Sequence, residues 1–323
     1  MHISNRLLRR LQIRKHNPAV KLFIQSCHAS LEFDYARLFN EMGHEVHGNW
    51  DIGSKERAKV KGVTDRNEDW HDFDFIILMQ VPDYTKVMRE MLEQGKRVIL
   101  SAFGQSDTWQ YAELARLTNK FEHAYIASYS KKDLNLYEKN GASEDKSRLI
   151  RFAKFLDDFR PWDGSKPQAY SACNSVHLRG VGCGWEHLSQ LKQRVPIIMS
   201  GVKTDEVGGL GQVSVDKMHE LFSTSACFAS FGTMPAAMVL TQIEAVCAGA
   251  PLVMWDNGFG CRDEGLTQMV CRNVDEMVVE IERLIKDESY RQRRHEESMA
   301  AREMFNLKNI TPLWGELIER AMV

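Results

Sequence analysis

Short apolar runs alternate with amphipathic stretches along most of the chain. The strands expected in the first half are KLFIQSC, FDFIILMQ, KRVILSAF and HAYIASYS, at residues 21–27, 73–80, 96–103 and 123–130, with another beginning at 44–47. Between the first two runs, Leu31, Tyr35 and Leu38 recur at helical spacing. Helices are likewise expected over 83–94 and 108–119. Strands that alternate with helices predict an α/β fold, with a parallel sheet covered on both faces.

The alternation pauses at FLDDFRPWDGSKPQ, residues 155–168, where two prolines, a glycine and a serine predict a linker. The strands expected after it are NSVHLRG, PIIMSG, ACFASFG and PLVMWD, at 174–180, 196–201, 226–232 and 251–256. Helices are expected over 186–193, 215–222 and 274–287. A chain of 323 residues suits two domains of roughly 150 residues each. We place them at 1–155 and 168–300, with terminal helices over 301–323.

Composition narrows the choice of function. A hydrophobic content of 43% and a charged content of 27% are typical of a soluble globular protein. The net charge of −2 argues against a pure nucleic-acid-binding protein and leaves open an enzyme with a local basic groove. The seven cysteines are odd in number and form no CxxC pair, which indicates a reducing cytoplasm rather than a disulfide framework or zinc ribbon.

The first residues, MHISNRLLRRLQIRKHN, mix basic and apolar side chains and lack the apolar block of a signal peptide. Two interpretations remain open for this basic N-terminal arm: an amphipathic helix that contacts membrane or nucleic acid, and a solvated helix packed on the first domain. No apolar run approaches the about 20 residues of a membrane span. An integral membrane segment is therefore not expected.

Several common catalytic motifs are missing. No GxGxxG follows the first strand, where the chain reads SCHAS, and there is no P-loop, GxSxG elbow or HExxH pair. A dinucleotide enzyme, a P-loop NTPase and an elbow-type serine hydrolase are thus disfavoured. No metal is implied either, because the histidines are scattered.

The stretch SFGTMPAAMVLTQIEAVCAGAPLV, residues 230–253, carries the most specific signal. It reads as the end of a strand, then a helix that begins at 233–238, with Pro235 suited to the first turn and Ser230 or Thr233 to the cap. The small side chains of Ala236 and Ala237 allow an anion to approach the free N–H groups at that helix start. A phosphate is the anion that such a site favours.

Glu244 stands alone among apolar and small residues in this helix. A half-buried carboxylate needs a partner, and the stretch contains no Lys or Arg. We therefore expect a partner from outside the chain, such as a pair of polyol hydroxyls beside the phosphate. The alternative is a helix carboxylate that faces solvent or a backbone N–H.

EAVCAGAPLV, residues 244–253, resembles the donor-binding motif of GT-B glycosyltransferases of the family-4 (group 1) type. Virus-type DNA glucosyltransferases are a more distant resemblance. Four other segments fit the family in order and extend the similarity over nearly the whole chain. They are EMGHEV, SYSKKDLNLYEKNGA, FLDDFRPW and VSVDKMHELFSTSACFAS, at 41–46, 128–142, 155–162 and 213–230.

The resemblance implies two Rossmann-like domains that face each other across a cleft, with C-terminal helices crossing back to the first. It implies that Glu244 binds the donor ribose and that Arg179 stabilises the leaving diphosphate. The remaining donor-binding candidates are Gly201, Thr233, Ala236, Ala237 and Met238. The sequence departs from the family at Ala236, where an earlier Glu is common, and lacks the Lys that usually follows the Arg. No cofactor is implied besides the nucleotide sugar.

An inverting transferase needs a base within reach of the acceptor hydroxyl, whereas a retaining one does not. Asp107 and His28 are the candidates, because each follows a strand at the carboxyl end, where open α/β sheets bind ligands. Asp107 is equally suited to cap the helix that begins TWQYAEL. The expected function is transfer of a sugar from a nucleotide donor to a glycan, a lipid-linked acceptor or a DNA base. A non-catalytic nucleotide-sugar-binding protein and a sugar-nucleotide epimerase are the alternatives.

Overall fold

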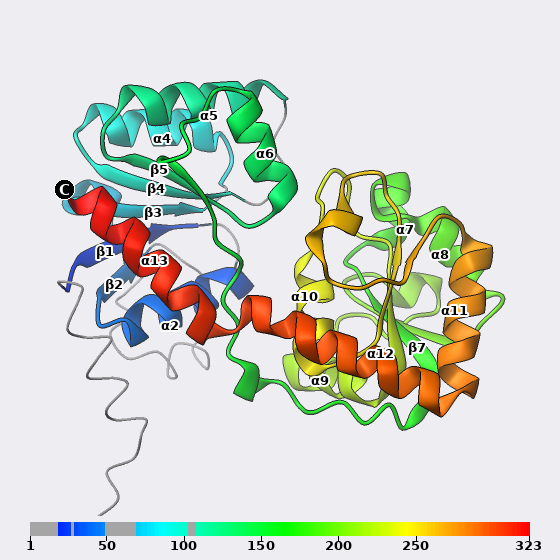
Figure 1. Cartoon of the computed structure of the whole chain (residues 1–323). Coiled ribbons are helices and arrows are strands. Elements are labelled where there is room, and N and C mark those ends of the chain that lie inside the picture. Colours follow the sequence, from blue (N-terminus) through cyan, green and yellow to red (C-terminus); the bar gives the residue numbers. More distant parts are fainter. Residues whose placement is uncertain (1–18, 27–28, 49–68, 80, 103–107) are drawn as a thin grey trace, which may run out of the picture. The chain divides into compact units, whose positions relative to one another are not determined.

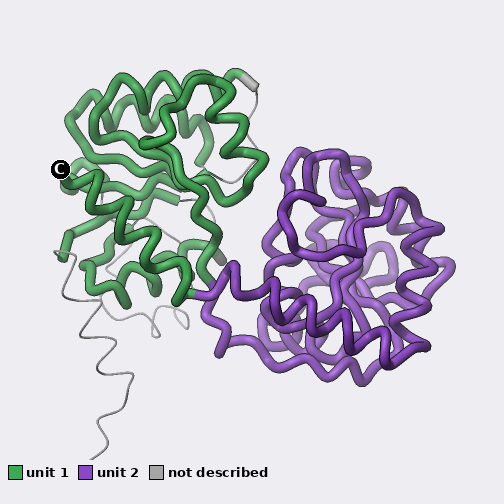
Figure 2. The backbone as a smooth tube through the Cα atoms, in the orientation of Figure 1, with its two compact units in different colours: residues 1–153, 307–323 green, residues 154–306 purple. Residues whose placement is uncertain are grey.

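The computed structural model describes residues 19–26, 29–48, 69–79, 81–102 and 108–323 (Figure 1). The chain forms two compact units, coloured separately in Figure 2. Unit 1 consists of Met1–Ala153 together with Leu307–Val323, and unit 2 consists of Lys154–Asn306. Each unit contains one parallel sheet with helices between its strands, which confirms the predicted α/β class.

The sheet of unit 1 has six strands in the order β2-β1-β3-β4-β5-β6, and all its pairs are parallel. Its strands are β1 (Lys21–Gln25), β2 (Glu45–Gly48), β3 (Phe75–Met79), β4 (Arg97–Ala102), β5 (Ala124–Ser128) and β6 (Ser147–Leu149). Every residue of β3 and β5 is buried, as expected for strands that are covered on both faces. The sequence pattern missed β6, a short strand at the edge of the sheet.

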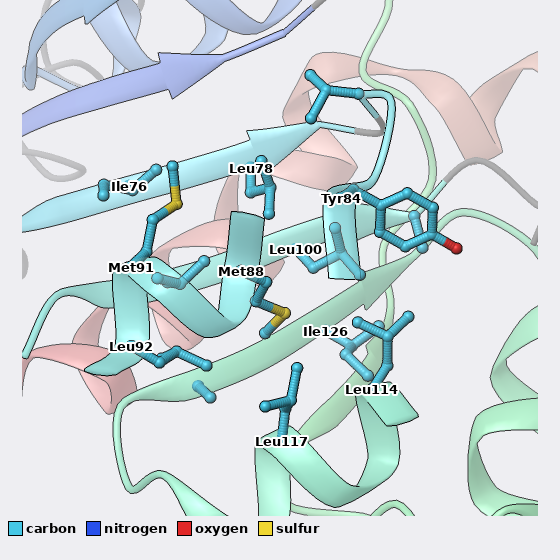
Figure 3. Close-up of a cluster of buried hydrophobic side chains, with 14 of the residues drawn as sticks. Ile76, Leu78, Tyr84, Met88, Met91, Leu92, Leu100, Leu114, Leu117 and Ile126 are labelled. Carbon is cyan, nitrogen blue, oxygen red and sulfur yellow. The ribbon is translucent and has the colours of Figure 1, made fainter. Parts of the chain in front are cut away.

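Helices cover both faces of this sheet (Figure 1). They are α2 (Ala29–Glu41), α4 (Tyr84–Glu93), α5 (Thr108–Lys120), α6 (Lys131–Lys139) and α13 (Leu307–Met322), with the short 3-10 helix η1 (Trp70–Asp72). Met88 of α4 and Leu114 of α5 pack against Leu100 of the sheet in the cluster of Figure 3. The other face is covered by α2 and by α13, whose Trp314 is fully buried. Unit 1 is thus completed by the end of the chain.

His44 lies just before β2 and is 3% exposed. Its Nδ1 accepts a hydrogen bond from the Val20 N–H at 3.3 Å, so the proton of the neutral ring sits on Nε2, which has no partner among the described residues. Burial lowers the pKa of His44 from 6.5 to about 4.

This pKa makes the stability of the protein sensitive to acid. Between pH 6.5 and about 4 the unfolded chain binds a proton that the folded chain does not, so stability is complete above this window and falls as the pH drops through it. The expected loss approaches about 3 kcal/mol. His44→Asn keeps an acceptor for Val20 and should reduce this loss, as measured by urea unfolding at pH 7.5 and 4.5. An equal loss in both proteins would contradict the assignment.

The sheet of unit 2 has five strands in the order β11-β10-β9-β7-β8, again all parallel. Its strands are β7 (Lys166–Ala172), β8 (Ile197–Ser200), β9 (Ser225–Ser230), β10 (Leu252–Trp255) and β11 (Val270–Cys271). Its helices are α7 (Val176–Arg179), α8 (Trp185–Lys192), α9 (Val215–Thr224), α10 (Leu240–Ala248), α11 (Val274–Lys286) and α12 (Glu288–Ala301). The 3-10 helices are η2 (Leu156–Asp158), η3 (Gly180–Cys183), η4 (Asp205–Val207), η5 (Cys261–Glu264) and η6 (Arg302–Phe305).

The start of unit 2 differs from the prediction. The strand expected over 174–180 is wrong, because Val176–Arg179 forms one helical turn and the strand β7 precedes it. β7 is KPQAYSA, whose first residues are exposed and whose buried residues are mostly small, so no apolar run marks it. Tyr170 provides its main packing, with its ring edge against Phe222 and Phe228. Among the described residues, each helix is too short or too polar to cross a lipid bilayer.

Candidate functional site

The carboxyl ends of the unit 2 strands meet along one edge of the sheet, because all five strands are parallel. Loops follow the strands at this edge: 173–184 after β7, 201–211 after β8, 231–239 after β9 and 256–269 after β10. Most of the predicted donor-binding residues lie in these loops. Edges of this kind are where open α/β sheets bind ligands.

Glu244 lies in α10 and is 9% exposed. Its partner is Lys154, whose Nζ donates to Glu244 Oε1 at 3.3 Å although the two residues are 90 positions apart. Glu244 therefore has a partner within the chain, which the absence of Lys and Arg from residues 230–253 did not predict. The pKa of Tyr170, on the neighbouring β7, is raised to about 12 by burial and also by the negative charge of Glu244.

The segment between β9 and α10 is a loop rather than the start of a helix. The helix expected to begin at 233–238 begins at Leu240. In this loop the backbone of Ala236 is already hydrogen-bonded. Its N–H donates to Thr233 O at 2.8 Å in a turn, and its carbonyl oxygen accepts from Asn257 Nδ2 at 3.2 Å. The first turn of α10 is closed by Gln242, which accepts from the Val239 N–H at 2.9 Å. Neither Ser230 nor Thr233 caps the helix.

Gln242 also connects this loop to the strand before it. Its Nε2 donates to Ser230 Oγ at 2.9 Å, and the same oxygen accepts from the Gly232 N–H at 3.2 Å. The side chains of Ala236, Ala237 and Met238 are at most 2% exposed. These residues form the packed side of the loop, backbone included, so a ligand that approaches the loop meets the half-buried residues 232–235, among them Thr233. The sequence analysis missed Gln242 and Asn257, which hold the loop.

Arg179 ends α7 and its side chain is exposed, with no ion pair among the described residues. The turn that follows it is joined to the 231–239 loop, because the Met234 N–H donates to Gly182 O at 2.8 Å and Cys183 Sγ lies 3.8 Å from Thr233 Oγ1. Gly184 permits this approach: a Cβ there would lie 2.6 Å from the Phe231 Cβ. The structure thus brings the turn after Arg179 together with Thr233.

Gly201 follows β8 in a backbone conformation with φ +132°, which disfavours other residues. A Cβ at this position would lie 2.4 Å from Cys173 O, so only glycine allows the loops after β7 and β8 to approach so closely. The Cys173 thiol and the Arg179 charge both lower the pKa of Cys183 below its ordinary value. Both interactions place Arg179 and the two thiols near one another at this edge.

The candidate acceptor bases His28 and Asp107 lie outside the described residues, as does the basic N-terminal arm. Among the described residues, the carboxyl edge of the unit 1 sheet carries a buried polar cluster. Asp133 is fully buried and accepts from Tyr111 Oη at 2.5 Å and from the Ser130 hydroxyl, which also caps α6. This cluster fixes the start of α6.

Comparisons with known proteins identify the fold. No family model matches the chain, and no curated protein sequence matches it. Among solved structures, Anabaena HepE in complex with UDP-glucose matches with a TM-score of 0.71 and 12% identity, over 93% of this chain and 99% of HepE. Sucrose-phosphate synthase from Thermosynechococcus elongatus matches with a TM-score of 0.68 and 12% identity, over 94% of this chain and 99% of the other.

A glycosyltransferase from Rickettsia africae also matches with a TM-score of 0.68 and 14% identity, over 95% of this chain and 99% of that one. These matches extend over both units of the chain and leave almost nothing of either protein uncovered. Identities of 12–14% carry information about the fold alone. The chain therefore has the GT-B fold, as the resemblance implied.

Proposed function

We propose that the protein is a glycosyltransferase that moves a sugar from a nucleotide donor to a hydroxyl acceptor. The observation that carries the proposal is the buried Glu244 carboxylate, held by Lys154 in the helix that follows the 231–239 loop of a chain with the GT-B fold. An ionised carboxylate only accepts hydrogen bonds, so its natural partners in a ligand are hydroxyl groups such as those of a ribose.

Unit 2 is the proposed donor-binding domain. Glu244 would accept hydrogen bonds from the ribose hydroxyls, while Thr233 and its half-buried neighbours at 232–235 would face the diphosphate. The buried Ala236, Ala237 and Met238 would support this segment from behind. Arg179 has an exposed guanidinium at the same edge of the sheet and would stabilise the charge on the leaving diphosphate, without a metal or further cofactor. Gly201 belongs to this donor-binding set because it allows the segments after β7 and β8 to lie close together.

Unit 1 is the proposed acceptor domain, and the terminal helix α13 belongs to it. The acceptor oxygen would attack the anomeric carbon as the bond from that carbon to the phosphate oxygen breaks, which releases the nucleoside diphosphate. In an inverting reaction the acceptor proton would pass to Asp107 or His28. In a retaining reaction the acceptor proton would pass to the oxygen of the leaving phosphate, so neither residue would be needed as a base.

A thermal-shift panel with UDP, GDP, ADP, dTDP and NAD tests the donor site. We expect one nucleoside diphosphate to stabilise the protein, by about 2.7 kcal/mol at 100 times its Kd. UDP is the first choice, because the structurally similar HepE was solved with UDP and UDP-glucose. No shift with any of them, or a shift with NAD alone, would contradict the proposal.

Labelled acceptors test the second half of the reaction. Transfer to a glycan or a lipid-linked acceptor, or to a DNA base with steep salt dependence through the basic arm, would name the acceptor class. Conversion of the donor without any acceptor would indicate an epimerase, and binding without transfer would indicate a non-catalytic protein. A cytoplasmic location is part of the proposal, since Cys173 and the five buried cysteines of unit 2 are free thiols.

A further inference from the structure

Lys154 is the first residue of unit 2, and its backbone is fixed by a pairing with the last residues of that unit. Its N–H donates to Phe305 O at 2.7 Å, and it forms a parallel bridge with Asn306. Unit 2 is thus entered and left by two chain segments that are hydrogen-bonded to each other. This pairing fixes the position from which the Lys154 side chain extends.

The Lys154 side chain is 5% exposed and ends at Glu244, whose own side chain is 12% exposed. Its ammonium group binds Oε1, and among the described residues no group hydrogen-bonds Oε2. Burying a carboxylate is costly unless a positive charge or hydrogen-bond donors compensate for the lost hydration. Lys154 supplies such a charge and also restricts the orientation of the carboxylate.

We propose that Lys154 is a positioning residue for the donor. Its ammonium group holds the Glu244 carboxylate in one orientation, so that Oε2 is presented to the hydroxyl groups of the donor ribose. The inference rests on the proposed function. It adds that affinity for the nucleotide depends on a residue outside the donor-binding loops, at the point where the chain enters unit 2. Preorganised groups bind more tightly because less ordering remains for the binding step.

Four variants test this role: Lys154→Met, Lys154→Arg, Glu244→Gln and the Lys154→Met/Glu244→Gln double variant. Calorimetry with UDP, or with the nucleoside diphosphate that the panel identifies, measures Kd for each. We expect Lys154→Met to weaken binding by about tenfold or more, and Lys154→Arg to recover most of the loss. In the Glu244→Gln background, Lys154→Met should change Kd by less than about twofold, because both substitutions remove the same interaction.

The readouts separate a positioning role from a merely structural one. During turnover, Lys154→Met should raise KM for the donor and leave KM for the acceptor unchanged. Lys86, which is exposed and lies in unit 1, supplies the control Lys86→Met, for which no change is expected. If Lys154→Met leaves a buried carboxylate uncompensated and fails to fold, the double variant removes both charges, and Lys154→Arg retains the pair.

Three results would contradict the inference. Unchanged binding in folded Lys154→Met would show that Glu244 needs no positioning, and equal losses in both backgrounds would show that Lys154 acts separately from Glu244. Where Lys154→Met does not fold, wild-type affinity in the double variant would likewise overturn it, because that variant lacks both charges of the pair. Failure of the wild-type protein to bind any nucleoside diphosphate would instead contradict the proposed function itself.

Discussion

Glu244→Ala is expected to lower kcat/KM for the donor by about 100-fold or more. Hydrogen bonds to a charged group contribute about 1.5–3 kcal/mol each. A ribose diol offers two donors to the carboxylate, so the expected loss is at least about 3 kcal/mol, which corresponds to more than 10²-fold in affinity. Steady-state kinetics with varied donor, together with calorimetry for the nucleoside diphosphate, measure this loss.

Two further variants identify the cause of the loss in kcat/KM. Glu244→Gln keeps the shape of the side chain and one carbonyl acceptor, so a smaller loss is expected from it than from Glu244→Ala. Glu186 is an exposed carboxylate at the start of α8 in the same unit, and Glu186→Ala should leave the kinetics unchanged. Activity of Glu244→Ala within about threefold of wild type would mean that Glu244 serves only to neutralise Lys154.

The strands of this protein are predictable from the sequence where their apolar pattern is strong. The strands β3, β4 and β5 are buried on both faces and appear as continuous apolar runs, so the pattern located them. β7 lies inside the unit 2 sheet but is built from polar and small residues around Tyr170. No apolar run marks it, and its first three residues fall within the predicted linker. β6 and β11 lie at sheet edges and are too short to form a pattern.

At the candidate site, the sequence predicts local features but not contacts between distant residues. The end of helix α10 at Gly249 was predictable because local residues determine it, whereas its start at Leu240 was not. The partner of Glu244 was not predictable either, because Lys154 lies 90 positions away in the sequence. One signal was available: Lys154 interrupts the otherwise apolar run FAKFL between Phe152 and Phe155, both of which are buried. A cation at a buried position implies a buried anion elsewhere in the fold.

Trp314→Ala is expected to destabilise unit 1 by about 3–5 kcal/mol. Trp314 is fully buried and its ring meets those of Tyr35 and Phe39 edge to face, at centroid distances of 5.6 and 5.1 Å. These contacts attach the terminal helix α13 to α2, near the opposite end of the chain. The substitution would therefore leave a large cavity between α13 and α2, two helices that are far apart in the sequence. Urea unfolding measures the loss in the free energy of unfolding.

Trp109 provides a matched control, because it lies in the same unit and has the same side chain but is 59% exposed. Trp109→Ala removes little buried surface and should change stability by no more than about 0.5 kcal/mol. Comparable losses in the two variants would mean that α13 does not pack on α2 as described. A loss confined to Trp314→Ala would show that the end of the chain is part of the core of unit 1, so that removal of residues 307–323 should also prevent stable folding of this unit.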